Sequence, residues 1–282
     1  MVEKEPANIW IKLGNIDYRW LYALSFVLMV IPILRPIGLP TLVSEPTKGY
    51  YNAIVSLPPG SVVAVSFQGS AALLDEQEAQ FIATWKILFE RDLKVIFYCP
   101  SSDGVIILNE ELEKIVKPEK YGKVYGVDYV RLGYAPLGET GEAALATNIR
   151  SVFPTDLYGT PLDEIPMMKD INDHTDIDLL IFQHTACTSV EWPIRQWVVP
   201  YGMKVITMTL GCCGPMAAPY YPKQILGFLA GSGMGTELEV LSGHPGPGAV
   251  MSDAKNFGVL GLLVFLVFGN LSYLGKRFGR KE

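Results

Sequence analysis

The sequence is poor in charge, which is unusual for a water-soluble domain. Charged residues make up 18% of its 282 residues and hydrophobic residues 49%, and the deficit of charge is concentrated in two runs. Residues 20–39 contain one charged residue, Arg35, and residues 257–274 contain none. Because about 20 helical residues span a hydrocarbon core of about 30 Å, the sequence predicts a transmembrane helix in each run.

The features of a cleaved signal peptide are also missing. Such a peptide has a short leader before its apolar run and a small-residue cleavage site after it. Here a polar leader that contains Glu3, Glu5 and Asp17 precedes the run, and no such site follows. We interpret residues 1–19 as a tail and residues 20–39 as a retained helix, which its prolines kink or end early. A buried core helix is the alternative for either run.

Basic residues are scarce between the two runs. The segments outside residues 40–256 carry a net charge of +4, which leaves −10 between them because the whole chain carries −6. So acidic a segment is a poor partner for nucleic acid, since phosphate binding needs clustered Lys and Arg. The basic tail 276–282 follows the second run directly. The positive-inside rule therefore predicts a two-pass protein of the cell membrane, with both termini in the cytoplasm and residues 40–250 outside the cell.

The second membrane helix is expected over residues 251–275, and it contains small and polar residues. Gly258 and Gly261 allow close helix packing, and Asn270 needs a hydrogen-bond partner on the other helix or on another subunit. Besides the lipid bilayer, we therefore predict a homo-oligomer or a complex with other membrane-protein subunits. The residues expected in or next to the membrane are Trp20, Leu34, Arg35, Phe257, Asn270, Lys276 and Arg277.

No internal repeat, heptad pattern or low-complexity tract interrupts residues 40–250. Short apolar runs alternate there with longer amphipathic segments, and several runs are almost continuously apolar, as in strands that are covered on both faces. This alternation predicts an α/β domain with a doubly wound, mostly parallel sheet of about five strands, either Rossmann-like or flavodoxin-like. The expected strands cover residues 61–67, 93–99, 128–135, 178–184 and 203–210.

Three stretches of the chain carry a resemblance. They are RPIGLP (residues 35–40), LPPGSVVAVSF (57–67) and FPTDLYGTPLDEIPMMK (153–169). They resemble an uncharacterised family of prokaryotic membrane proteins in which a Rossmann-like domain lies between two terminal transmembrane helices. The resemblance implies this architecture and no activity.

Several signatures of catalysis and cofactor binding are absent. The sequence contains no Gly-x-Ser-x-Gly nucleophile turn, and the turn after the first expected strand has one glycine and no phosphate-binding lysine. The glycine-rich stretch GSGMG (residues 231–235) is interpreted as the flexible end of a helix. We therefore expect no cofactor, and we regard an enzyme as the less favoured interpretation.

The four cysteines all follow expected strands. Cys99 ends the second strand, Cys187 follows the fourth close to His184, and Cys212 and Cys213 follow the fifth. In a parallel sheet these positions share one edge, where ligands usually bind. Three interpretations stay open: inert buried thiols, a disulfide of Cys187 with one of the adjacent pair, or a zinc or thiolate site that uses His184.

Other polar residues suggest weaker sites. Residues that could bind a ligand at the same edge are Ser66, Gln68, Cys99, Ser101 and Thr209. The acidic stretch around Asp173, His174 and Asp176 could collect a hard cation, but it lacks the glycine-centred calcium loop and is interpreted as a solvated turn.

Three functions follow from these patterns. The leading one is a membrane-anchored domain that acts by binding or by assembly of a membrane complex. The second is a membrane-tethered thiol- or metal-dependent enzyme that uses Cys187, His184, Cys212 and Cys213. The third is a sensor that binds a small ligand at the strand ends.

Overall fold

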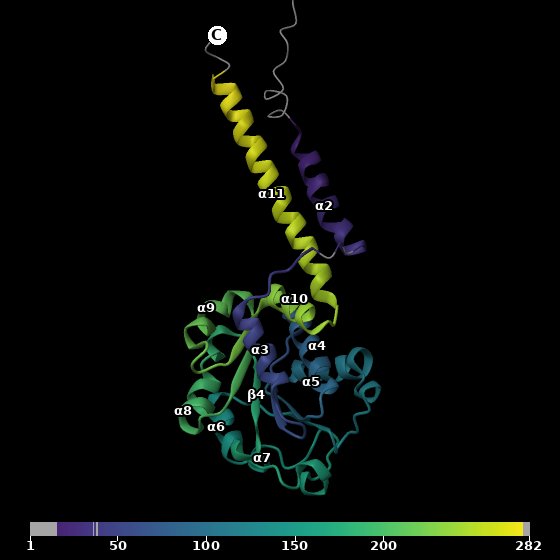
Figure 1. Cartoon of the computed structure of the whole chain (residues 1–282), viewed down its shortest axis with the longest axis vertical. Helices are drawn as coiled ribbons and strands as arrows, with labels where there is room; N and C mark the ends of the chain where they lie inside the picture. Colours follow the sequence, from purple (N-terminus) through teal and green to yellow (C-terminus); the bar gives the residue numbers. More distant parts are fainter. Residues whose placement is uncertain (1–15, 36, 38, 279–282) are drawn as a thin grey trace, which may run out of the picture. The chain divides into compact units, whose positions relative to one another are not determined.

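A computed structural model describes residues 16–35, 37 and 39–278 of the chain (Figure 1). The chain divides into two compact units, one formed by residues 41–248 and the other by the segments before and after it. The larger unit contains the sheet, and the smaller one contains two helices.

The larger unit is built on six parallel strands, one more than the sequence predicted. They are β1 (Val62–Phe67), β2 (Lys94–Cys99), β3 (Tyr129–Tyr134), β4 (Leu179–Gln183), β5 (Val205–Thr209) and β6 (Gly227–Ala230), in the order β3-β2-β1-β4-β5-β6. This is the Rossmann order, in which the connections reverse direction between β1 and β4. The missed strand, β6, is only four residues long and begins with glycine.

Gly227 explains why that strand is inconspicuous in the sequence. A Cβ atom at this position would collide with the backbone nitrogen of Tyr50, on the helix α3 (Glu45–Val55) that lies across the strand. Glycine is a poor strand former, but here it allows two backbones to approach closely.

Helices cover both faces of the sheet (Figure 1). One face packs against α3, α4 (Leu74–Glu90), α5 (Ser102–Glu111) and α10 (Gly231–Ser242). The other packs against α6 (Glu139–Thr147), α7 (Ile149–Val152), α9 (Gly214–Ala217) and the segment 190–198, which ends in a π-helical turn before the single-turn α8 (Val199–Tyr201).

The two covered faces account for the apolar strands. All six residues of β1 are buried. Val63, Val65 and Phe67 belong to the core under α4, whereas Val62 and Ala64 belong to the core under α6. Alternation between apolar and polar residues is lost because neither face meets water.

The glycine-rich stretch 231–235 was placed wrongly in the sequence analysis. It directly follows β6 and forms the first turn of α10, whose N-cap is Ala230. Gly231 has a φ of +67°, and a Cβ atom at Gly235 would lie 2.9 Å from that of Ala79 on α4. The glycines therefore serve a sharp strand-to-helix turn and close helix packing.

The smaller unit contains α11 (Pro247–Phe278), the only helix among the described residues that is long and apolar enough to cross a membrane. Only 11% of the apolar 18-residue stretch of this helix is buried by other parts of the protein, so α11 is not a core helix. Phe257 is half-buried, Arg277 is exposed, and the side chain of Lys276 lies outside the described part.

The first predicted span is shorter than expected. Helix α2 covers Tyr18–Leu34, 17 residues or about 26 Å at 1.5 Å per residue, and it falls short of the length that identifies a span. The helix ends there because Arg35 is extended, with φ −143° and ψ 90°, which is the conformation favoured before a proline. Trp20 and Leu34 are exposed, as are most large apolar side chains of α2 and α11.

The polar and small residues of α11 have partners within the smaller unit. The Asp253 carboxylate accepts hydrogen bonds from the backbone N–H groups of Ile37 and Leu39 at 2.8 and 3.0 Å. A Cβ atom on Gly261 would lie 3.0 Å from Leu28 of α2. Asn270 donates to the carbonyl of Leu266, one turn earlier in its own helix, at 2.8 Å.

Candidate functional site

The strand order brings three of the four cysteines together. Strands β4 and β5 are neighbours, so the turns that follow them lie side by side at the carboxyl edge of the sheet. Cys187 in the first turn and Cys213 in the second form a disulfide, with their Cα atoms 4.9 Å apart and 26 positions apart in the sequence. Of the three interpretations of the cysteines, the structure contains the disulfide.

Cys212 is a free thiol beside this disulfide. Its Sγ lies 4.0 Å from that of Cys187 and 3.7 Å from that of Cys213. Cys212 is exposed, Cys187 is half-buried, and Cys213 is completely buried. We call these three residues the sulfur cluster. One sulfur therefore faces solvent, and the disulfide beside it is buried on its Cys213 side and partly exposed on its Cys187 side.

The turn that carries Cys212 is held by α4 and β6. The Glu76 carboxylate of α4 accepts a hydrogen bond from the backbone N–H of Gly211 at 2.6 Å. A Cβ atom on Gly214 would lie 2.9 Å from that of Ala230. Cys213 also belongs to the apolar core under α6. The backbone that carries the free Cys212 thiol is therefore held in place.

Cys99 lies apart from the sulfur cluster. It ends β2, which is separated from β4 by β1, and it is completely buried. Burial raises the pKa of its thiol well above the usual range, because a thiolate would lose its hydration there. Cys99 is an inert core residue and a suitable control for the other three.

His184 does not join the sulfur cluster, although the sequence places it three residues before Cys187. Among the described residues the cluster contains no histidine. The ring of His184 is completely buried, stacks on Phe182 and lies 3.1 Å from the Ser189 hydroxyl. Burial lowers its pKa to about 3, so the ring is neutral at pH 7. The geometry gives no support to His184 as the base that activates a thiol.

Glutamines fill the crevice between β1 and β4, where Rossmann-type folds usually bind ligands. Gln183 accepts from the Gly69 N–H at 3.0 Å and donates to Gln77, which in turn donates to the His184 carbonyl. Gln68 accepts from the Thr185 N–H at 3.0 Å. All three glutamines are buried, so their hydrogen bonds are made within the protein at this edge.

Two of the remaining candidate ligand residues at this edge, Ser66 and Ser101, make hydrogen bonds inside the protein, and Thr209 is buried. Ser101 caps α5 by accepting from the Gly104 N–H at 3.0 Å. The Thr209 hydroxyl is completely buried and has no hydrogen-bond partner within the described residues. Ser66 donates to the Glu142 carboxylate of α6 at 3.3 Å. The geometry thus weakens the hypothesis of a small-ligand sensor at the strand ends.

Glu142 is a buried carboxyl group that the sequence analysis missed. It is completely buried and accepts hydrogen bonds from the Tyr98 hydroxyl at 2.9 Å and from Ser66. Burial raises its pKa to about 7, although both hydrogen bonds oppose the rise. The sequence feature that could have revealed Glu142 is a glutamate on the apolar side of an amphipathic helix. Glu142 titrates near neutral pH inside the core.

The acidic stretch 173–176 forms a turn. The Asp173 carboxylate accepts hydrogen bonds from the side chain and the backbone of Thr175, the N–H at 2.8 Å. These hydrogen bonds lower the pKa of Asp173. Asp176 accepts from the Asn172 N–H at 2.8 Å, and the His174 ring stacks on Tyr201. Within the described part of the chain, these groups do not converge as metal ligands.

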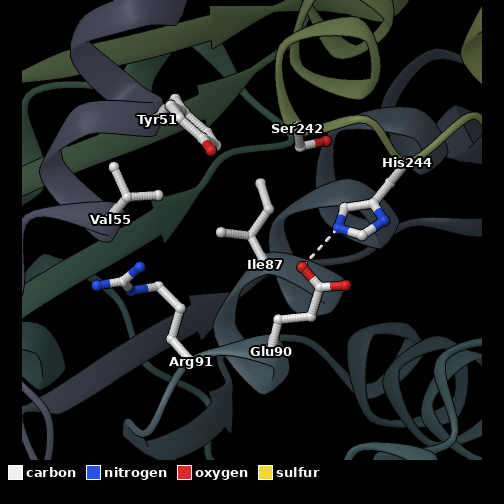
Figure 2. A pocket seen from close by; sticks show the side chains of 7 residues that line it. All are labelled: Tyr51, Val55, Ile87, Glu90, Arg91, Ser242 and His244. Atoms are coloured by element: carbon white, nitrogen blue, oxygen red, sulfur yellow. Dashed lines mark hydrogen bonds and ion pairs between the residues drawn. The ribbon is translucent and has the colours of Figure 1, made fainter.

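A second candidate lies at the opposite edge of the sheet, where α3, α4 and α10 all end. The cavity there has a volume of about 180 Å³. The His244 ring, which points towards Glu90 in Figure 2, lies 2.8 Å from the Glu90 carboxylate. The helix carbonyl ends favour positive charge there, and Arg91 supplies it. The volume is below the 300–1,000 Å³ typical of ligand sites. The seven residues that line it are Tyr51, Val55, Ile87, Glu90, Arg91, Ser242 and His244.

Comparisons with known proteins give no family. No family model, no curated protein and no solved structure matches the chain. The resemblance to prokaryotic membrane proteins therefore stays a prediction, and the function has to be argued from the geometry of the site.

Proposed function

We propose that this chain is a membrane-anchored thiol–disulfide exchange protein whose reactive group is the sulfur cluster. The observation that supports this is the exposed Cys212 thiol, 4.0 and 3.7 Å from the two sulfurs of the disulfide. Exchange proceeds by attack of a thiolate on a disulfide sulfur. The cluster places all three required sulfurs together before any partner binds.

The internal step moves the disulfide towards the surface. The Cys212 thiolate attacks the Cys187 sulfur, the Cys187–Cys212 bond forms, and Cys213 leaves as a thiolate. Attack on Cys213 instead would join adjacent residues, whose Cα atoms are about 3.8 Å apart and therefore closer than the 4.4–6.8 Å that disulfides prefer. Cys187 is thus the sulfur that both other cysteines share.

The external step oxidises a substrate dithiol. A substrate thiolate attacks the exposed Cys212 sulfur, forms a mixed disulfide, and releases the Cys187 thiolate. The second substrate thiolate then attacks the substrate sulfur of that mixed disulfide and releases Cys212. The substrate gains a disulfide and loses two electrons, and the cluster becomes three thiols. We propose dithiols of proteins at the membrane surface as the substrates, because an exposed sulfur on a membrane-anchored domain is accessible to them.

The anchoring part of the proposal has separate support. Helix α11 has the length and composition of a membrane span, and both helices expose apolar side chains. The charge bias of the ends places both termini in the cytoplasm and the α/β domain outside the cell, if α2 also crosses the membrane. An extracytoplasmic domain would meet the oxidising surroundings in which disulfides persist.

Cys212→Ser tests the proposed function. With a two-cysteine peptide in single-turnover experiments, peptide oxidation by the variant is expected to be at least tenfold slower than by the wild type. The serine oxygen cannot relay the disulfide, and the half-buried Cys187 sulfur must then react directly. Peptide thiols are counted by alkylation and mass spectrometry.

Cys99→Ser is the matched control, because it removes a thiol outside the cluster. This variant should oxidise the peptide at the wild-type rate. Equal rates for the wild type and for Cys212→Ser would overturn the proposed function.

The role in binding or assembly of a membrane complex stays a prediction, as does an oligomeric state. The glycines and Asn270 of α11, which suggested a partner, have contacts within the smaller unit. Size measurement in mild detergent remains the direct test of association.

A further inference from the structure

We propose that the sulfur cluster, once reduced, is a zinc site formed by the thiolates of Cys187, Cys212 and Cys213. This inference rests on the proposed function in one respect, since the Cys187–Cys213 disulfide must be reducible in the folded chain. It assigns the same sulfurs a second state. In the oxidised state they form a disulfide, and in the reduced state they bind a metal.

The spacing of the sulfurs fits the ion. A zinc–sulfur bond of about 2.3 Å places two sulfurs of a tetrahedral site about 3.8 Å apart, and those of a trigonal site about 4.0 Å apart. Cys212 lies 3.7 Å from Cys213 and 4.0 Å from Cys187. Two of the three sulfur–sulfur separations therefore already match, although Cys212 and Cys213 are adjacent in the sequence.

The third separation is the disulfide itself, which reduction opens. A dithiol reductant delivers two electrons, the sulfur–sulfur bond breaks, and Cys187 and Cys213 become thiols. These two sulfurs then have to move apart to the distance of metal ligands, which side-chain rotation allows. The turn of Cys213 keeps its place because Glu76 and the apolar core hold its backbone.

The donor set points to a thiophilic cation. Among the described residues, no histidine or carboxylate joins the three sulfurs in a group whose ligand atoms all lie within 4.8 Å of one another. Soft thiolates select zinc or copper(I) over magnesium, calcium and manganese. Three protein ligands leave one position open, and the exposure of Cys212 makes that position accessible to water or to a ligand from a partner.

Zinc and the disulfide then exclude each other. A disulfide oxidant that acts on the zinc-bound form takes two electrons, restores the Cys187–Cys213 bond, releases zinc and becomes two thiols. Zinc in turn holds the cluster reduced and blocks dithiol oxidation. We therefore expect oxidation of the cluster to release zinc, and bound zinc to prevent the disulfide from forming.

The experiment uses the full chain in detergent, reduced with a dithiol, then incubated with zinc chloride without oxygen and desalted. We expect about one zinc per chain in the wild type and in Cys99→Ser, and almost none in Cys212→Ser, whose exposed position leaves the core intact. Oxidation with a small disulfide should release the bound zinc, and thiols are counted in parallel.

The outcomes separate the two proposals. If the folded chain yields no new thiols on reduction, the proposed function and this inference both fail. If the thiols appear and Cys212→Ser slows dithiol oxidation, but the wild type retains no zinc, only this inference is overturned. Equal zinc content in the wild type and in Cys212→Ser contradicts the assignment of the ligands in the same way.

Discussion

Cys187→Ser is expected to lower the free energy of unfolding of the α/β domain by about 3.5 kcal/mol without reductant and to abolish dithiol oxidation. The cross-link joins residues 26 positions apart, and its removal restores to the unfolded chain the entropy that closing such a loop costs. Activity is lost because Cys187 is the sulfur that Cys212 and Cys213 share. Denaturant unfolding measures the first effect and single-turnover oxidation of a peptide dithiol the second.

A reductant provides the matched control for this prediction. In the presence of a dithiol reductant, the wild type and Cys187→Ser should unfold at nearly the same denaturant concentration, because the wild type then also lacks the cross-link. If Cys187→Ser and the wild type are equally stable without reductant, the disulfide does not form and the prediction is wrong.

Glu142→Gln is expected to remove a fall in stability between about pH 4.5 and pH 7. Burial raises the pKa of Glu142 to about 7, so the folded chain holds a proton that the unfolded chain releases near pH 4.5. Since the folded state binds more protons in this window, its stability decreases as the pH rises. The difference between the pKa values of Glu142 in the folded and unfolded chains corresponds to about 3 kcal/mol of stability. Glutamine stays neutral and still accepts from Tyr98.

The measurement is the free energy of unfolding as a function of pH for both proteins. Glu111 also has a pKa raised to about 7 by burial and by neighbouring acids, so the wild type and the variant both keep that contribution. The difference between their curves isolates Glu142. Parallel curves from pH 4.5 to 7 would contradict a buried, titrating Glu142.

Most of the sheet could be predicted from the sequence because each of its first five strands lies in a short, mainly apolar run between helical segments. The run around β1 is such a case, with all six strand residues buried. The sixth strand could not be found this way, because Gly227 is there to avoid the backbone of α3, and only the packed structure reveals that neighbour. Missing β6 then led to the wrong position for the glycines 231–235.

The candidate site could be predicted only in part. The shared edge of the cysteines follows from parallel strands, and a disulfide of Cys187 was one of the three interpretations of the sequence. The sequence could not choose between Cys212 and Cys213, since both follow β5, nor exclude Cys99, since its distance depends on strand order. The roles of Gln77 and Gln183 could not be predicted either. In the sequence they are ordinary polar residues, and their hydrogen bonds depend on how β1, β4 and α4 pack together.

The membrane helices show a similar division. Helix α11 was apparent from an uncharged run. The prolines predicted that the first helix is kinked or ends early, and α2 does end at Leu34, before the extended Arg35. Composition predicted 20 residues of span where the helix supplies 17.

The most direct test of the account is a map of the thiols and disulfides in the full chain, made by alkylation under native conditions and mass spectrometry without reduction. The account predicts that Cys212 is alkylated rapidly, that Cys99 reacts only after unfolding, and that the peptides of Cys187 and Cys213 stay linked. An unreactive Cys212, or four separate thiols in the native chain, would contradict it.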